Sequence, residues 1–234
     1  YGSLSPHWRP PAKLLDEDTV DEDDAVGDES SSDDSKFVPI RALNFVSGTK
    51  SVFNVYVRLG DGRYLKILHA GDEFSPDRVL KYVGKGVTHF HLKKSAQEQY
   101  IRYCDKLAAA LISKKQPVGL THVALTLNHG EETIKFLERN GISESHLKHA
   151  EAYVTNVAQL VKSTGMDKLS IFKDFLEDVV AYEHGVATTL IAAILGKQFQ
   201  FDSQMSNRIL GLASLFHDIG LIQMDPELNF QLCF

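Results

Sequence analysis

The sequence lacks the features that mark a disulfide-stabilised or membrane-spanning chain. Its 234 residues include two cysteines, Cys104 and Cys233, which are too few for a disulfide framework. The longest nearly apolar run, residues 186–196, is much shorter than the roughly 20 residues that cross a bilayer. No N-terminal stretch combines basic residues, an apolar core and a small-residue cleavage site. We therefore expect a cytoplasmic protein with no membrane span.

An excess of positive charge is also missing. The formal net charge is -6, but residues 1–36 alone hold 11 of the 31 acidic residues and 3 of the 25 basic ones. The rest of the chain is therefore nearly neutral, and it has no basic stripe of the kind that follows a phosphate backbone. This charge distribution argues against binding to a nucleic-acid polymer.

Residues 1–36 have the composition of a solvated arm or linker. They carry three prolines, two acidic runs and a serine triplet, and few residues that could be buried. Such a segment cannot offset the entropy lost on ordering by burying apolar surface. Trp8, Leu14 and Leu15 are the residues that could dock part of this arm on a folded surface.

Residues 37–93 have the pattern of a small α/β input domain. Residues 52–59 are rich in β-formers, residues 60–62 give a tight-turn signal, and residues 63–68 alternate with period two, which together predict a β-hairpin. Ser75 and Pro76 then predict the start of a helix that ends near Gly84, and residues 87–92 read as a further strand.

The second half of the chain is predicted to be helical. We expect helices over residues 96–113, 130–140, 144–164, 171–196 and 204–216, separated by turn signals. Residues 94–139 would connect the input domain to a bundle formed by residues 140–234. The fold class is therefore α+β, a small N-terminal α/β domain followed by an all-helical bundle.

Most of the ten histidines show no pattern that requires a function. His89 and His91 lie on one face of a predicted strand, but no acidic or cysteine partner follows at metal-ligand spacing. His146 and His149 are three residues apart on a predicted helix, where we expect a solvated face. Both pairs are interpreted as structural rather than metal-binding.

Three other residues form a candidate metal site. His217 and Asp218 end a helix whose apolar positions (Ile209, Leu212, Ala213, Leu215 and Phe216) predict burial, so both side chains are expected next to the core, where polar groups need partners. The helix from His184 and the helix leading to His217 have matched lengths and a short connection. Their outer ends should meet, which would bring His184 to the His217–Asp218 pair.

At these residues the sequence resembles the HD superfamily of metal-dependent phosphohydrolases. Residues 183–186 and 215–220 are similar, more narrowly, to the first half of the HD-GYP family, the cyclic di-GMP phosphodiesterases. The order of a small input domain before a helical HD-type domain also resembles that family. The likeness covers about residues 140–230.

The resemblance implies that His184, His217 and Asp218 are metal ligands, and that Asp218 is the catalytic residue because it bridges two divalent ions. Two such ions would polarise a phosphodiester, activate a water and stabilise the leaving oxygen. A mixed imidazole and carboxylate set suits iron or manganese as well as zinc, and the resemblance favours iron or manganese. Val180 stands where some relatives carry an extra acidic ligand, so two ions are expected rather than three.

The sequence also departs from the HD-GYP pattern. Leu221 occupies the position of a phosphate-binding lysine, and Asp225 lies too close to Asp218 to replace the family's last aspartate. The later histidines and the Gly-Tyr-Pro loop would fall beyond Phe234. These departures are compatible with a weak or degenerate enzyme.

The resemblance and the departures from it leave three candidate functions. The first is a metal-dependent phosphodiesterase that hydrolyses cyclic di-GMP. The second is a non-catalytic signalling module that senses a cyclic dinucleotide or docks protein partners through its N-terminal domain and acidic arm. The third is an HD-type hydrolase that acts on another nucleotide.

Overall fold

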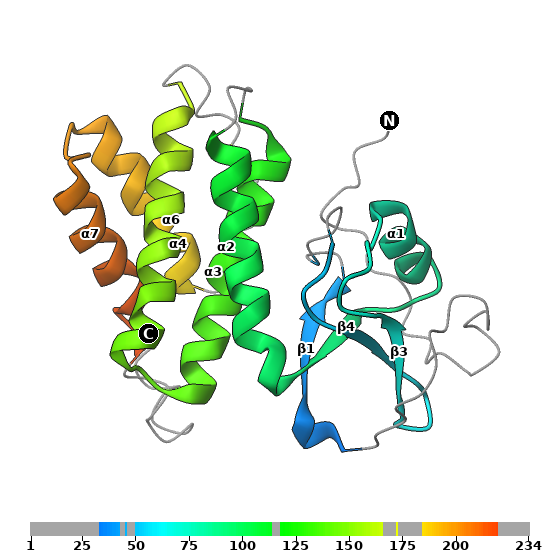
Figure 1. Ribbon diagram of the computed structural model, residues 1–234. Coiled ribbons are helices and arrows are strands. Elements are labelled where there is room, and N and C mark those ends of the chain that lie inside the picture. Colours follow the sequence, from blue (N-terminus) through cyan, green and yellow to red (C-terminus); the bar gives the residue numbers. More distant parts are fainter. Residues whose placement is uncertain are drawn as a thin grey trace, which may run out of the picture. The chain divides into compact units, whose positions relative to one another are not determined.

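The computed structural model describes residues 33–42, 45, 50–113, 118–165, 172 and 184–219 (Figure 1). The chain divides into two compact units, residues 1–100 and residues 101–234. The first contains the described strands and the second is helical, so the α+β fold class is confirmed. No helix in the described ranges is long and apolar enough to span a bilayer.

The first unit is built on a four-stranded antiparallel sheet. Its strands are β1 (Phe37–Arg41), β2 (Val55–Arg58), β3 (Tyr64–Leu68) and β4 (His89–Lys93), in the order β1-β4-β2-β3. β2 and β3 form the predicted hairpin, in which the Leu59 amide donates to the Arg63 carbonyl at 2.8 Å. Gly62 has a φ of 88°, a left-handed conformation that glycine adopts without steric cost.

One helix, α1 (Pro76–Gly84), covers one face of this sheet. Its start is as predicted, because the Ser75 hydroxyl accepts the Arg78 amide and Pro76 occupies the first turn. Tyr82 of α1 packs edge-on against Phe90 of β4, with ring centroids 5.9 Å apart. Aromatic packing of this kind dominates the core of the first unit.

The opposite face of the sheet carries a smaller cluster of buried aromatic rings. Phe37 stacks on Tyr64 with centroids 3.8 Å apart, and Tyr56 packs edge-on against Phe37. The Tyr64 hydroxyl donates to Asp34 at 2.8 Å. Asp34 lies in a short 3-10 helix (η3, Asp34–Lys36) just before β1. Its hydrogen bond with Tyr64 therefore links this short helix to β3.

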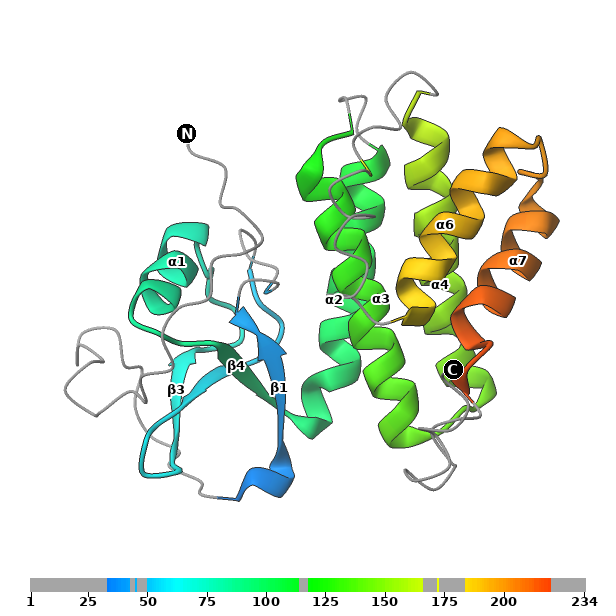
Figure 2. The same ribbon diagram turned by 180° about the vertical axis from the view of Figure 1, so that it is seen from behind.

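The second unit is a bundle of helices: α2 (Gln97–Ser113) from residue 101 onward, α3 (Leu120–Asn140), α4 (Glu144–Ser163), α6 (His184–Gln198) and α7 (Gln204–Phe216). The 3-10 turn η5 (Lys94–Ala96) precedes α2. The predicted limits of α2, α4 and α7 agree with the structure to within one residue at each end. Of the helix predicted over residues 171–196, the part up to residue 183 lies outside the described residues, apart from Phe172. Figure 2 shows α4, α6 and α7 side by side from the reverse direction.

The helix predicted from Gly130 in fact begins at Leu120. Gly130 therefore lies inside α3, where a glycine normally lowers helix stability. A Cβ on Gly130 would lie 2.6 Å from the Tyr153 ring of α4, so the glycine permits close packing of the two helices. The predicted start lies too late because the local sequence does not show that this glycine serves the packing of two helices.

His129 is an unusual feature of the bundle core. It is fully buried, and neither ring nitrogen has a hydrogen-bond partner among the described residues. Burial, with a smaller effect of nearby His149, lowers the pKa of His129 to about 3. The imidazole is therefore neutral in the folded protein at neutral pH, although nothing in the sequence distinguished this histidine from the others.

We expect His129 to make the bundle sensitive to acid. The unfolded chain binds a proton at this side chain below about pH 6.5, whereas the folded state excludes it down to about pH 3. The free energy of unfolding therefore falls on acidification through this range, by up to ~1.4 kcal/mol per pH unit from this group. The unfolding free energy is measured at several pH values from urea unfolding curves followed by circular dichroism. In His129→Leu this part of its dependence on pH should disappear.

Thr133→Val is the matched control, because Thr133 is a buried, non-titrating residue on the same helix whose hydroxyl donates to the His129 carbonyl. This variant should change the stability without changing its dependence on pH. A wild-type pH slope in His129→Leu would contradict the interpretation.

Candidate metal centre

The helical hairpin of α6 and α7 positions the candidate residues. Just beyond the end of α6, Gln200 has a left-handed conformation (φ 62°), which lets the Phe201 amide donate to the Gly196 carbonyl at 2.7 Å. Ser203 then caps α7 by accepting the Ser206 amide at 3.0 Å. Because the connection is short, the chain reverses and the start of α6 lies beside the end of α7.

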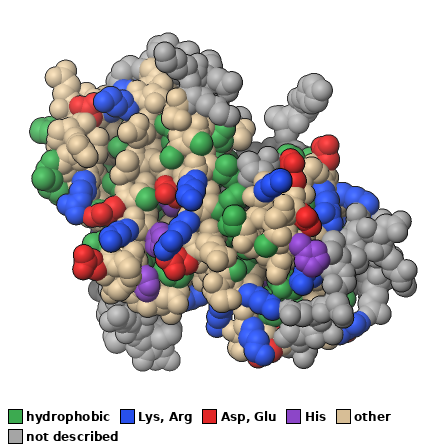
Figure 3. Space-filling model, viewed as in Figure 1, with side chains coloured by type: hydrophobic (Ala, Val, Ile, Leu, Met, Phe, Trp, Pro, Cys, Tyr) green, Lys and Arg blue, Asp and Glu red, His purple; other side chains and the backbone are tan. Residues whose placement is uncertain are grey.

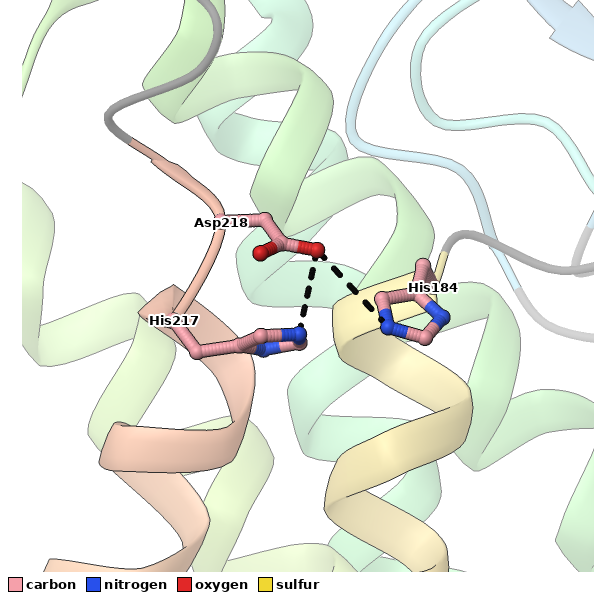
Figure 4. A group of neighbouring side chains, drawn as sticks. All are labelled: His184, His217 and Asp218. Atoms are coloured by element: carbon pink, nitrogen blue, oxygen red, sulfur yellow. Dashed lines mark ion pairs between the residues drawn. The ribbon is translucent and has the colours of Figure 1, made fainter. Parts of the chain in front are cut away.

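His184, His217 and Asp218 lie together at this end of the hairpin (Figure 4). Asp218 Oδ2 is 3.0 Å from His217 Nε2 and 3.7 Å from His184 Nε2. One ligand atom from each residue falls within 4.8 Å of the others. Ligands bound to one ion at about 2.1 Å lie roughly 3 to 3.5 Å apart when adjacent. The His217–Asp218 pair has this spacing, and the His184–Asp218 pair is slightly wider.

The protonation of His217 gives a chemical reason for a cation at this point. Its Nδ1 lies 2.8 Å from the Ser214 carbonyl oxygen, which can only accept, so Nδ1 carries the hydrogen. In the neutral imidazole the Nε2 lone pair then faces the Asp218 carboxylate at 3.0 Å. Two acceptors at that distance require a proton or a metal ion between them. A backbone carbonyl that fixes the tautomer in this way is typical of metal-binding histidines.

The exposure of the three residues differs from the expectation. Their side chains are 67% (His184), 37% (His217) and 49% (Asp218) exposed, so the prediction that His217 and Asp218 lie against the core was wrong. The reason is that α7 is at the edge of the bundle and buries only a narrow stripe. Leu215 belongs to this stripe and is 3% exposed, whereas Ile209 lies outside it and is 56% exposed.

An apolar strip accordingly remains exposed on the hairpin within the described residues. It is visible as green side chains over α7 and the end of α6 in Figure 3. Its members are Leu195, Phe199, Phe201, Met205, Ile209 and Leu210. The apolar pattern of α7 therefore includes residues that α4 and α6 do not cover.

Two glycines bring the backbones close enough for the site to form. A Cβ on Gly185 would lie 2.5 Å from the Leu215 carbonyl oxygen of α7. A Cβ on Gly211 would lie 2.3 Å from a methyl group of Val154 on α4. Since Gly185 follows His184 and Leu215 shortly precedes His217, the first contact sets the separation of the candidate ligands directly.

Tyr153 is a positioning residue that the sequence did not indicate. Its ring is buried in the bundle, and its hydroxyl donates to the Val186 carbonyl of α6 at 3.0 Å. Burial, and to a lesser extent Glu131, raises the pKa of Tyr153, so the hydroxyl stays protonated and remains a donor. This bond anchors the turn of α6 that carries His184.

The other histidine pairs do not form a comparable group. His89 and His91 share a sheet face, but no group of three possible ligands includes either of them in the described part of the chain. His149 is buried with its ring 5.8 Å from that of Phe136, so the expectation of a solvated face at His146 and His149 was wrong for His149. Val180, Leu221 and Asp225, to which the family pattern drew attention, lie outside the described residues.

Comparison with known proteins gives one similar structure to set beside this site. No family model and no curated protein matches the sequence. Among solved structures, Bd1817, an HDG"Y"P protein from Bdellovibrio bacteriovorus, matches with 18% sequence identity and a TM-score of 0.48. The match covers 82% of this chain and 66% of that chain.

We expect Gly185→Ala to disturb the site. The added methyl group meets backbone rather than a flexible side chain, so α6 must move away from α7, at a cost of about 1 to 3 kcal/mol in unfolding free energy. The affinity for Mn²⁺, measured by isothermal titration calorimetry, should fall with it.

Gly196→Ala is the matched control on the same helix, because its Cβ would meet nothing closer than the Phe201 carbonyl oxygen at 3.4 Å. It should retain both stability and Mn²⁺ affinity. Equal behaviour of the two variants would show that the Gly185 contact does not set the ligand spacing.

Proposed function

We propose that the chain is part of a metal-dependent phosphodiesterase of HD-GYP type, with cyclic di-GMP as its substrate. The observation that carries the proposal is the convergence of His184, His217 and Asp218 from two helices, with ligand atoms within 4.8 Å of one another. The carbonyl that fixes the His217 tautomer supports the same assignment.

The three side chains would hold divalent metal. A mixed imidazole and carboxylate set suits iron, manganese or zinc, and the resemblance to the HD-GYP family favours iron or manganese. Asp218 Oδ2 faces both imidazoles, so Asp218 would hold the metal together with His184 and His217. When bound, the metal pair supplies charge stabilisation to the phosphodiester and lowers the pKa of a water.

The chain's own residues would orient the metal and leave it accessible. Ser214 holds the His217 ring through Nδ1, and Tyr153 anchors the α6 backbone next to His184. The exposure of all three candidate ligands suits a substrate as large as a cyclic dinucleotide, which must approach from solvent. The described residues provide one imidazole and carboxylate cluster, and Asp218 is the residue that we assign to catalysis.

A non-catalytic signalling module is the second candidate. Leu221 in place of a phosphate-binding lysine favours it, because a leucine offers no charge to a substrate phosphate. In that case cyclic di-GMP, or a partner protein docked on the N-terminal unit, would be bound without hydrolysis. A hydrolase specific for another nucleotide is the third candidate.

The metal assignment is tested by elemental analysis of the purified full chain. His217→Ala and Asp218→Ala should each lose most of the bound iron or manganese, because each removes one of the three converging ligands. His146→Ala and Asp202→Ala are the controls, since they remove the same residue types elsewhere in the helical unit and should retain the metal. Retention of metal in both site variants would refute the assignment.

Activity is tested separately by incubating the metal-loaded chain with cyclic di-GMP and separating the products by chromatography. A linear dinucleotide that is absent with Asp218→Ala supports the phosphodiesterase. Saturable binding without product supports the signalling module, and cleavage of other nucleotides in a substrate panel supports the third candidate.

A further inference from the structure

A groove opens in the first unit where two neighbouring strands separate. β2 and β4 are paired at Tyr56 and His91, and the pairing extends no further among the described residues. Beyond it, residues 57–60 and 86–89 line a groove of about 330 Å³. This volume lies at the lower end of the range of small-molecule sites. The groove is confined to residues 1–100 and does not involve the candidate metal centre.

The polar side chains that line the groove are rich in hydrogen-bond donors. Arg58, His89 and His91 are among them, and none of the described residues lining it is acidic. Arg58 is held by a bidentate pair with Asp34, with both contacts at 3.1 Å. That pair uses two of the five guanidinium N–H groups and orients the side chain, so the guanidinium is held in a fixed plane at the groove.

His91 adds a neutral donor. Its Nδ1 is buried without a hydrogen-bond partner. Burial is the main reason that its pKa is lowered to about 4, with contributions from His89 and Arg58 that Asp34 partly opposes. A buried lone pair without a partner costs less than a buried N–H without one, which favours hydrogen on Nε2. The Tyr64 ring packs edge-on against the imidazole at 5.0 Å and fixes its plane.

The surrounding charges favour an anion. Arg41 is the register partner of His89, and Lys93 lies over the Tyr56 ring on the same face of the sheet. Asp34 is the carboxylate beside Arg58, and two N–H groups of that arginine already compensate it. The apolar side chains of the lining are those of Pro39, Val57, Leu59 and Val87, and the groove is larger than a single phosphate.

We propose that this groove is a binding site for a small organic oxyanion, a phosphate ester or carboxylate attached to an apolar or aromatic body. Arg58 and His91 hold the oxyanion, and the apolar lining contacts the body. The N-terminal unit is thereby a ligand-binding module in its own right.

Nuclear magnetic resonance of the full chain with labelled histidine tests this site. The protein is kept metal-free with a chelator, so that phosphate cannot bind through metal at the other site. Phenyl phosphate should shift the ring signals of His89 and His91 saturably and leave those of His184 and His217 unchanged. Inorganic phosphate should bind more weakly, because it makes no apolar contact. A benzoate titration shows whether the site prefers carboxylate or phosphate.

Arg58→Gln should weaken the binding of phenyl phosphate by about tenfold or more. Arg58→Lys, which keeps the charge but loses the fork, should give an intermediate loss. Arg63→Gln is the control, because Arg63 is an exposed arginine in the adjacent turn that pairs with Asp61 and does not line the groove. Phenyl phosphate binding that does not saturate, that is matched by uncharged phenol, or that survives Arg58→Gln would overturn the proposal.

Discussion

The close approach of α6 to α7 is the constraint on which the candidate metal centre depends. The Leu215 carbonyl occupies the space that any side chain at position 185 would need, so the two helices can pack only through a glycine there. The distance between the helix backbones in turn sets the distance between His184 and the His217–Asp218 pair. A metal site built in this way is as rigid as the packing beneath it.

The bundle supports this hairpin through polar groups as well as apolar ones. Tyr153 donates to the α6 backbone, and the Thr189 hydroxyl of α6 donates to the Gly185 carbonyl within its own helix. Lys197, near the other end of α6, donates to the Val161 carbonyl at the end of α4. Since α6 is tied to α4 at both ends, the candidate ligands extend from a fixed support although they are themselves exposed.

The two units show different chemistry. The helical unit presents a cluster of two imidazoles and a carboxylate, which suits a cation. The N-terminal unit presents an arginine and two imidazoles around a groove without acidic lining, which suits an anion. In the proposed phosphodiesterase the helical unit would act on a diester and the N-terminal unit would bind a separate small molecule. Each function can therefore be tested without the other.

The sequence by itself determined most of the helices, the β2–β3 hairpin and the choice of candidate ligands, but it gave no sign of β1 and placed the start of α3 at Gly130 instead of Leu120. Turn residues and alternation predict the β2–β3 hairpin, and Ser75 and Pro76 predict the start of α1. The matched helix lengths predict that His184 lies close to His217 and Asp218. These features depend on local chain geometry, which short patterns encode.

Only the tertiary structure decided which apolar residues are covered, why Gly130 and Gly185 must be glycine, that His129 is enclosed, and where β2 and β4 separate. Each of these depends on contacts between residues distant in sequence, and no local pattern records what packs against a given side chain.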